Sequence, residues 1–458
     1  MSLPLLLRRA AVATPPSGGG LWAAIASLRA HLSTTASGPE TDRYAHPPAP
    51  THAIVRGVSR GFKDAISMAS AGEAASIDAE KAAEQHRRYV ETLLSASASR
   101  AASAASAAAP PGRRRPPAPP LRLIELDAPD DLPDACFVED TAVVVPGSWL
   151  PPGEGGARLP SLAVVARPPA PARAGEVAAV RAALRRLEAS GGTEAAAAAA
   201  GAAPAGSPSP APQPAAVRVL GEIAAPGALD GGDVLILPPA GDPDVGGAGG
   251  GGGGRPSLVV LVGLSERTNA QGAAQLRDLL APHGVQVVAV PVAAALARLP
   301  PAAGGDRAPP PAAAHPPPSR PLHLKSAVTA LSSRVLVCAD GLAGRAIAAA
   351  VHGALLRARP PPLPPAPPSM SGGGGASAAA PAAAPGLPTF AFLPEGDACA
   401  ANVLLLGEAV VAQPASEASE RVLRFLCERE GRRLVLVDPP LDELKKADGA
   451  LTCCSILF

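Results

Sequence analysis

The sequence predicts an α/β or α+β fold in which short apolar strands alternate with amphipathic helices. Runs of β-branched and Leu residues of strand length recur along the chain. Longer segments with apolar residues at helical spacing lie between groups of these strands. Tracts of Ala, Pro, Gly and Ser without a period separate the elements. This order is not typical of a helical bundle or a sandwich, and it leaves the topology open.

The strand candidates are rich in Val, Ile and Leu: 121–126, 136–145, 162–167, 217–223, 234–237, 258–262, 285–291, 322–329, 334–337, 389–393, 402–412, 434–437 and 452–457. The helix candidates are 77–94, 173–188, 269–281, 416–430 and 441–446. Helix start signals support two of them. Pro414 precedes the helix at 416, and Ser76 and Asp78 stand at the start of the helix at 77.

The chain has 458 residues, of which 57 are Pro and 47 are Gly. Many of them fall in six tracts that are predicted to be inserts or linkers: 95–120, 146–158, 189–216, 238–256, 294–320 and 357–388. Such tracts bury too little apolar area to offset the entropy of ordering them. Without them, roughly 260–290 residues remain to pack, as one large domain or two small ones.

The formal net charge of +1 comes from 40 basic and 39 acidic residues, so no nucleic-acid partner is expected. No apolar run reaches the ~18–20 residues that span a bilayer, so no membrane segment is expected either. Residues 1–50 contain Arg, Ser and Thr but no acid before Glu40. This composition predicts a mitochondrial or plastid transit peptide, and otherwise a disordered tail on a cytoplasmic protein.

Three carboxylates adjoin a strongly apolar run, namely Asp134, Glu139 and Asp140. They could be solvated groups at the end of a strand. Because buried carboxylates are unfavourable unless paired, three of them at this run indicate instead a cradle for a planar guanidinium group.

A second group of acids, Asp230 and Asp233, flanks a Gly pair that lets the backbone bend or approach another segment closely. The same four residues would suit an ordinary turn before a strand. They match neither a Rossmann fingerprint nor a phosphate-binding loop, so no nucleotide is expected.

Two arginines and a histidine stand at or near the ends of predicted strands. Arg167 and Arg267 could each bind a carboxylate through two hydrogen bonds, or could simply be solvated. His323 alternates with Leu322 and Leu324 and is therefore expected to face away from them. A lone histidine in such a place is usually structural.

The six Cys residues contain no C-x-x-C pair, which is typical of a reduced intracellular protein. Cys453 and Cys454 are adjacent near the C-terminus, where either could be a core residue. One of them close to a histidine would be a candidate nucleophile. No Cys and His spacing suits a structural zinc site.

Together these segments resemble the dimethylarginine dimethylaminohydrolases. The matching segments follow the order of that family: 51–56, 85–90, 132–144, 229–235, 262–269, 322–326, 401–402 and 448–457. The resemblance implies the pentein fold, a five-bladed α/β propeller of ββαβ units around a polar central channel, and hence a single domain over 51–458 with the inserts between its elements. These repeats are not visible in the sequence itself.

The resemblance also implies hydrolysis of asymmetric dimethylarginine or monomethylarginine to citrulline and the methylamine. A small-molecule substrate, no organic cofactor and no catalytic metal are expected, in a monomer or homodimer. By the same resemblance Cys453 is the nucleophile, His323 the general acid and base, and Asp230 the acid that orients the histidine. The implied substrate contacts are Asp134, Glu139, Asp140, Arg167, Arg267, Ser326 and Asp448, with the two arginines at the α-carboxylate.

Two further points concern the lid and the second cysteine of the adjacent pair. The family has a mobile lid near 59–67, but this sequence differs there in length and residues, so no lid residue is assigned. Cys454 is expected to face away from Cys453, because adjacent strand positions point to opposite sides.

Three alternatives remain open. The substrate could be arginine or agmatine, although two carboxylate-binding arginines favour an amino acid over agmatine. The protein could be a non-enzymatic binding module, which would have no need of the complete set Cys453, His323 and Asp230. The long inserts could also stem from a poorly supported gene model, which would leave the ordered segments unaffected.

Overall fold

The computed structural model describes residues 47–67, 76–106, 120–151, 153, 157–190, 215–239, 258–300, 323–359, 387–394 and 397–458, with the backbone alone for 99–106. The predicted transit peptide lies outside this part except for residues 47–50. Most of the predicted inserts at 189–216, 238–256, 294–320 and 357–388 also lie outside it.

Four ββαβ units follow one another along the chain, each with a three-stranded sheet. In each sheet the second strand pairs antiparallel with the first and parallel with the third, and a helix joins the second strand to the third. The first unit comprises β3 (Ala142–Val145), β4 (Ser161–Val165), α5 (Glu176–Ala189) and β5 (Val217–Glu222). The second comprises β6 (Val234–Ile236), β7 (Leu258–Gly263), α7 (Ala270–Leu280) and β8 (Val285–Val290). The third comprises β9 (Val328–Ala330), β10 (Val335–Cys338), α9 (Gly341–Ala358) and β11 (Thr389–Phe392). The fourth comprises β12 (Leu404–Leu406), β13 (Ala409–Ala412), α10 (Glu417–Arg429) and β14 (Arg433–Leu436).

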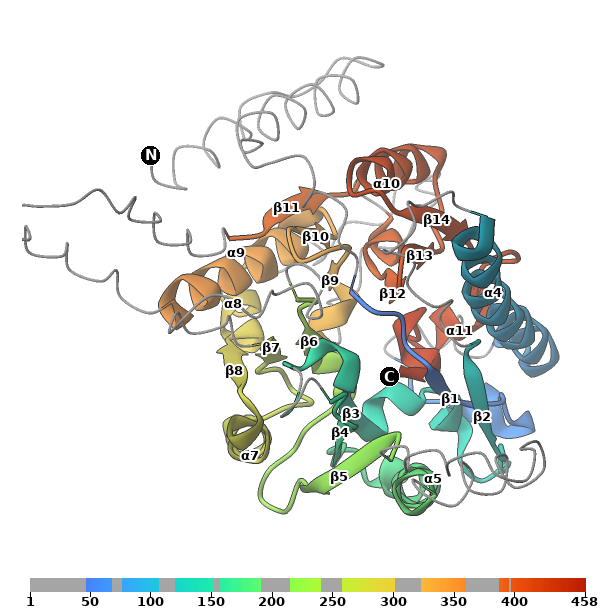
Figure 1. The fold of residues 1–458 in the computed structure, drawn as a ribbon, viewed down its shortest axis with the longest axis vertical. Helices are drawn as coiled ribbons and strands as arrows, with labels where there is room; N and C mark the ends of the chain where they lie inside the picture. Colours follow the sequence, from blue (N-terminus) through green and yellow to red (C-terminus); the bar gives the residue numbers. More distant parts are fainter. Residues whose placement is uncertain are drawn as a thin grey trace, which may run out of the picture.

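The fifth unit is assembled from both ends of the described chain. It comprises β15 (Ile456–Leu457), β1 (His52–Arg56), α4 (Ala79–Ser106) and β2 (Arg122–Leu126). Strand β1 pairs antiparallel with β15 and parallel with β2, so the sequence order is permuted but the unit is the same. Figure 1 shows the five units arranged in a ring, and the pentein architecture implied by the resemblance is thereby confirmed.

Apolar contacts between neighbouring units hold the ring together. The buried apolar residues described form five clusters, and each cluster draws on two successive units. One of them packs Val337 of β10 against the fourth unit through Val410 of β13. The first strands of all five units line a cavity of about 160 Å³ on the axis, which is mainly apolar but includes Glu139, Lys325 and Thr452.

Two predicted helices begin directly after the first residue of their predicted ranges, Ser416 and Asn269. Ser416 caps α10 by accepting a hydrogen bond from the backbone N of Ser419 at 3.2 Å. Asn269 caps α7 by accepting one from the backbone N of Gly272 at 2.8 Å. The helix predicted at 77–94 is confirmed as α4 but extends to Ser106, into the tract predicted to be an insert. Short, polar or small side chains at these ends thus mark the helix boundaries correctly.

Several other elements differ from the prediction. Strand β1 and helix α9 were not predicted; α9 is apolar on most of its surface, so its helical period is weak in the sequence. The strand predicted at 402–412 is a hairpin, because Gly407 adopts a left-handed conformation with φ of 64°. The strands predicted at 136–145 and 452–457 begin instead with 3-10 turns at Val138–Thr141 and Thr452–Cys454.

The prediction that residues 146–158 form an insert is also partly wrong. Trp149 is only 9% exposed, and Leu150 is buried beside it in an apolar cluster. The Trp149 indole N–H donates to the carbonyl oxygen of Pro48 at 3.1 Å.

Among the described helices, none has the length and apolar character to cross a membrane.

Candidate active site

A small pocket of about 20 Å³ gathers residues from six separate parts of the sequence. Six of the predicted site residues line it: Asp134, Asp140, Arg267, His323, Asp448 and Cys453. The other lining residues are Ile66, Phe137, Arg173, Ala447 and Gly449. The ring of units therefore brings the predicted nucleophile and the predicted general acid to the same buried space.

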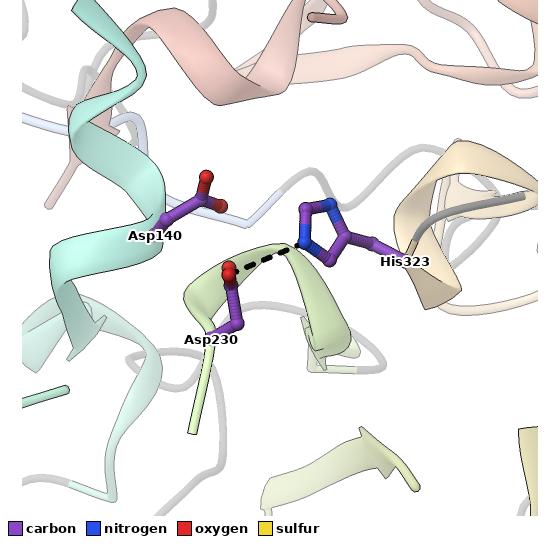
Figure 2. A group of neighbouring side chains, drawn as sticks. All are labelled: Asp140, Asp230 and His323. Atoms are coloured by element: carbon purple, nitrogen blue, oxygen red, sulfur yellow. Dashed lines mark ion pairs between the residues drawn. The ribbon is translucent and has the colours of Figure 1, made fainter. Parts of the chain in front are cut away.

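Two carboxylates, Asp140 and Asp230, face the His323 ring from the same side (Figure 2). Its Nε2 lies 3.3 Å from Oδ2 of Asp230, an ion-pair contact without the alignment of a hydrogen bond. Asp140 completes the group, since one ligand atom from each of the three residues lies within 4.8 Å of the others. All three side chains are buried, so their charges interact through a medium of low dielectric constant.

The Gly pair between Asp230 and Asp233 makes this approach possible. A Cβ at Gly232 would lie 2.6 Å from Nδ1 of His323, and a Cβ at Gly231 would lie 1.9 Å from the carbonyl oxygen of Glu139. The two glycines form a 3-10 turn that Asp230 caps by accepting a hydrogen bond from Gly232 N at 3.2 Å. Their role is thus close packing of three segments rather than an ordinary turn.

Asp233 orients the segment that carries His323, a role that the sequence did not reveal. Its Oδ1 accepts a hydrogen bond from the backbone N of Leu324 at 2.9 Å, and its Oδ2 accepts one from Ser265 Oγ at 2.6 Å. Leu324 is completely buried on the opposite side of the backbone, as alternation predicted. Burial raises the pKa of Asp233 even though the neighbouring His323 opposes the shift.

The carboxylates decide the charge of His323. Burial by itself would lower the pKa of the imidazole, but Asp230, Asp140 and Asp233 together raise it to about 10. His323 is therefore an imidazolium at neutral pH. The same proximity has opposite effects on the acids: burial raises the pKa of Asp230, whereas Arg173 and His323 hold the pKa of Asp140 below its usual value despite burial.

Cys453 lies in the 3-10 turn Thr452–Cys454 and is 7% exposed. Burial raises the pKa of its thiol well above the ordinary value, and the charges of Glu139 and Asp140 raise it further. The sulfur is therefore a thiol in the empty pocket. Cys454 is completely buried and does not line the pocket, and the two cysteines belong to a 3-10 turn rather than to the predicted strand.

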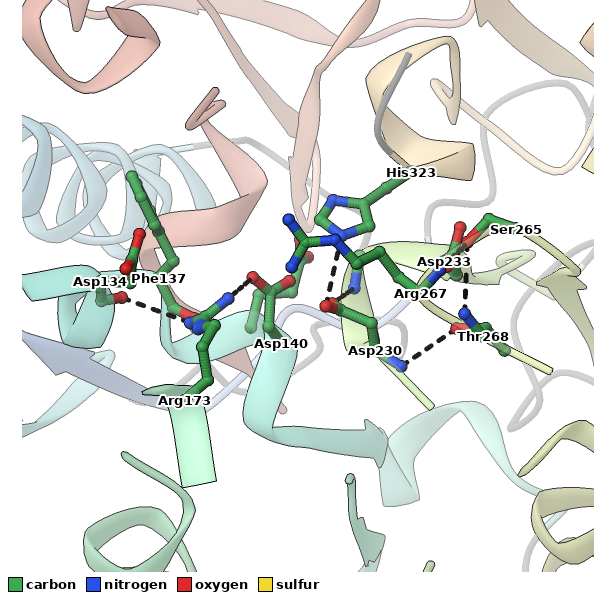
Figure 3. Close-up of polar contacts among 12 residues, drawn as sticks. Asp134, Phe137, Asp140, Arg173, Asp230, Asp233, Ser265, Arg267, Thr268 and His323 are labelled. Atoms are coloured by element: carbon green, nitrogen blue, oxygen red, sulfur yellow. Dashed lines mark hydrogen bonds and ion pairs between the residues drawn. The ribbon is translucent and has the colours of Figure 1, made fainter. Parts of the chain in front are cut away.

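Arg173 forms one wall of the pocket and was not among the predicted site residues. Its guanidinium donates to Asp140, to Oε2 of Glu176 at 2.6 Å and to the carbonyl oxygen of Phe137 at 3.1 Å (Figure 3). These acids raise the pKa of Arg173 although burial opposes them. Its local sequence, an arginine three residues before Glu176 at a helix start, did not distinguish it from an exposed arginine.

Arg267 extends into the same space from the loop after β7 (Figure 3). Its guanidinium forms no ion pair with any residue in the part of the chain that the structure describes. Arg267 is therefore available for an anionic group of a ligand, whereas Arg173 is held in the wall. Asp134 faces both cations and accepts hydrogen bonds from Ile66 N at 3.1 and 3.2 Å, yet burial raises its pKa.

Four predicted site residues do not line this pocket, and one of them, Asp230, lies behind it in contact with His323. Arg167 is exposed and donates to the carbonyl oxygen of Gly227 at 2.9 Å. Glu139 faces the axial cavity, where it accepts hydrogen bonds from Lys325 Nζ at 2.5 Å and from Thr452 Oγ1 at 2.9 Å. Ser326 ends the 3-10 turn after His323 and lines neither cavity.

Asp448 lines the pocket in an unusual backbone conformation, with φ of 57°. This left-handed region is tolerated by Asp better than by most residues. Gly449 follows it, and a Cβ there would lie 2.3 Å from the Phe137 ring. The close approach of this turn to Phe137 forms part of the pocket wall.

The three ligand atoms of Asp140, Asp230 and His323 are close enough to bind one cation. The positive charge of protonated His323 balances the negative charge of the same two carboxylates, because both raise its pKa. In both cases the site concentrates negative charge around an imidazole. The fold and this pocket define an α/β propeller with buried cysteine, histidine and aspartate groups at one site.

Comparison with known proteins leads to the same family as the motifs. The chain is 30% identical over 214 residues to the N(G),N(G)-dimethylarginine dimethylaminohydrolase of Streptomyces coelicolor. The match covers 47% of this chain and 49% of the relative, so the chain spans about half the length of this curated protein. The resemblance to the dimethylarginine dimethylaminohydrolases is thus confirmed at the level of sequence similarity. No family model matches the chain.

Solved structures of similar proteins cover nearly all of the chain. A dimethylarginine dimethylaminohydrolase from Pseudomonas aeruginosa, a cysteine-to-serine variant complexed with citrulline, has a TM-score of 0.49 and 19% identity and covers 90% of this chain and 100% of its own. The N-terminal domain of ArgZ, a cyanobacterial arginine dihydrolase, bound to substrate as a cysteine-to-serine variant, has a TM-score of 0.48 and 13% identity. That comparison covers 89% of this chain and 97% of the domain.

Proposed function

We propose that this protein hydrolyses the guanidino group of an arginine derivative, with asymmetric dimethylarginine or monomethylarginine as the substrate. The observation that carries the proposal is that Cys453 and His323 line one buried pocket with acidic walls, and that Asp230 lies 3.3 Å from the His323 ring. The similarity to the Streptomyces coelicolor enzyme supports the same class of reaction.

The charges of the pocket suit such a substrate. Asp134 and Asp140 are buried acids that can bind a planar cation through paired hydrogen bonds. Arg267 carries an unpaired guanidinium that suits the α-carboxylate, and Arg173 adds positive charge nearby. An amine such as agmatine lacks the carboxylate, so this arrangement favours an amino acid.

Binding of a guanidinium would also activate the nucleophile. The thiol pKa of Cys453 is high in the empty pocket because of burial and the nearby acids. A cation bound beside the sulfur favours the thiolate by opposite charge. The thiolate then attacks the central guanidinium carbon, and the bond to the methylated nitrogen breaks as His323 donates its proton to the departing amine.

The second half of the reaction returns the groups to their starting state. Neutral His323 takes a proton from water, and the oxygen attacks the carbon of the thiouronium intermediate. The carbon–sulfur bond breaks, leaving citrulline and the thiolate of Cys453, which regains a proton when the product departs. Asp230 stabilises the imidazolium in both half-reactions, because it lies 3.3 Å from Nε2 of His323.

The pocket must widen before a substrate binds. Its volume of about 20 Å³ is close to the space of a single water molecule. Ile66 and the turn at Ala447 to Gly449 form part of the pocket lining. Substrate entry is therefore expected to displace one or both of these segments.

The test is citrulline release from asymmetric dimethylarginine, monomethylarginine, arginine and agmatine in parallel. The proposal expects turnover of the methylated substrates and a covalent adduct on Cys453 in acid-quenched samples. Turnover of arginine alone would retain the mechanism and replace the substrate. Folded protein that turns over none of the four would instead support a binding module.

A further inference from the structure

Helix α4 holds the segment before Cys453 through its first turns. Gln85 Oε1 accepts a hydrogen bond from the backbone N of Glu443 at 3.0 Å, and Gln85 Nε2 donates to the Asp442 carboxylate. Glu443 Oε2 in turn accepts a hydrogen bond from the backbone N of Asp78 at 3.0 Å. These contacts anchor α11 (Asp442–Lys446), which directly precedes the pocket turn.

The next turn of α4 reaches the residues that follow Cys453. Tyr89 Oη lies 2.7 Å from Ser455 Oγ, and both side chains are buried. The His86 ring makes a polar contact with the backbone of Cys454. Gln85 and Tyr89 are four positions apart and therefore lie on the same face of the helix, with His86 beside them.

Between the two anchor points lies the turn that forms part of the pocket wall. Ala447, Asp448, Gly449 and Cys453 line the pocket, but Gln85, His86 and Tyr89 do not. Within the turn, Cys453 N donates to the carbonyl oxygen of Ala450 at 3.1 Å. A short 3-10 turn has weak hydrogen bonds of its own, so the place of the sulfur depends on its supports.

We propose that Tyr89 and His86 are positioning residues that orient the Cys453 sulfur toward the pocket through Ser455 and Cys454. The proposal rests on the proposed function only in taking Cys453 as the reacting group. It follows from the position of α4, which contacts the segment on both sides of the nucleophile without entering the pocket. A misplacement of about 1 Å in a reacting atom can slow a reaction by about 10²-fold.

The first experiment compares Tyr89→Phe, Ser455→Ala and the double variant. Turnover is measured as kcat and KM, and the rate of Cys453 alkylation by iodoacetamide is measured by peptide mass spectrometry. Each single variant is expected to lower both kcat and the alkylation rate by about 3–10-fold, with KM unchanged, as for one lost hydrogen bond. The double variant is expected to fall no further, because both substitutions remove the same contact.

A matched control is Leu93→Ala, one turn further along α4. Leu93 is fully buried in the same apolar cluster as Tyr89, but its side chain has no group that can hydrogen-bond Ser455 or Cys454. This variant is expected to lower the midpoint of urea unfolding while leaving kcat and the alkylation rate within about twofold of the original protein, because cavity formation acts mainly on stability.

His86→Leu and His86→Asn extend the test to the second contact. His86→Leu is expected to slow Cys453 alkylation, and the short polar side chain of His86→Asn is expected to restore part of the rate. An alkylation rate unchanged in Tyr89→Phe, or equally reduced in Leu93→Ala, would overturn the proposal. If no substrate is turned over, the proposed function fails, but the alkylation rates still decide the positioning role.

Discussion

Two buried histidines, His86 and His323, lie near the segment around Cys453 and belong to different elements. One is neutral and the other is positively charged at neutral pH. His86 and His323 are each 4% exposed. Burial lowers the pKa of His86 to about 4, opposed only by its contact with the Cys454 backbone. Three nearby carboxylates overcome burial at His323 and raise its pKa to about 10.

The comparison shows that burial alone does not decide the protonation of a histidine here. His86 lies in an apolar cluster with Tyr89 and Leu93, where the neutral imidazole is favoured. His323 lies among charged groups whose interactions are strong because the site excludes water. The segment of Cys453 and Cys454 therefore has a charged side suited to proton transfer and a neutral side suited to support.

The largest expected difference between the two sides comes from the adjacent cysteines. Cys453→Ser is expected to lower kcat by about 10⁴-fold or more, because it removes the nucleophile. Cys454→Ser is expected to retain most of the activity, since Cys454 does not line the pocket. Citrulline assays of both variants check this difference, and equal losses would disprove the assignment of Cys453.

The two histidines are expected to differ next. His323→Gln should lower kcat by about 10²–10⁴-fold, because it removes the proton donor to the leaving amine. His86→Leu should have a smaller effect on kcat, through the position of the sulfur alone. Steady-state kinetics measure both, and a loss for His86→Leu as large as that for His323→Gln would contradict the division into two sides.

A third difference concerns the two arginines predicted from the sequence. Arg267→Ala is expected to raise KM by about 10–100-fold, because it removes charged hydrogen bonds to the α-carboxylate. Arg167→Ala is the matched control and should leave KM nearly unchanged, since Arg167 is exposed and outside the pocket. A larger rise in KM for Arg167→Ala would restore the role that the resemblance implied.

The smallest effects are expected in the pH dependence of stability. The raised pKa of His323 contributes stability that is present below its ordinary pKa of 6.5 and is lost as pH rises toward about 10. The lowered pKa of His86 contributes stability that is present above 6.5 and is lost as pH falls toward about 4. Urea unfolding of the original protein against His323→Gln and His86→Leu should show a difference that changes in each of these windows.

The acidic motif shows how far the sequence alone could place the site. It correctly directed Asp134 and Asp140 to the pocket, since charged groups at an apolar run are rarely buried without a partner. The backbone between them was predicted as a strand but forms two 3-10 turns, which direct Glu139 to the axial cavity instead. A change from strand to turn alters the direction of every side chain, so spacing alone was insufficient.

The arginines illustrate the same limit at longer range. Arg167 and Arg173 both follow β4, and nothing in their local sequence distinguishes a wall residue from an exposed one. Arg173 enters the pocket because a 3-10 turn, Pro171–Gly175, leads into α5 and brings it to Asp140 and Glu176. The position of Arg173 thus depends on how the first unit packs, and the sequence pattern does not predict that packing.

The resemblance predicted the reactive groups Cys453, His323 and Asp230. By itself, the sequence determined the local features of this protein, namely the starts of α7 and α10 and the apolar runs that became strands. These features depend on residues within a few positions of one another. Only the tertiary structure decided that β15 joins β1 to complete the fifth unit, that Arg173 rather than Arg167 meets the acids, and that His86 is neutral whereas His323 is charged. Each of these outcomes depends on contacts between residues far apart in the chain, where packing and local electric fields outweigh local preference.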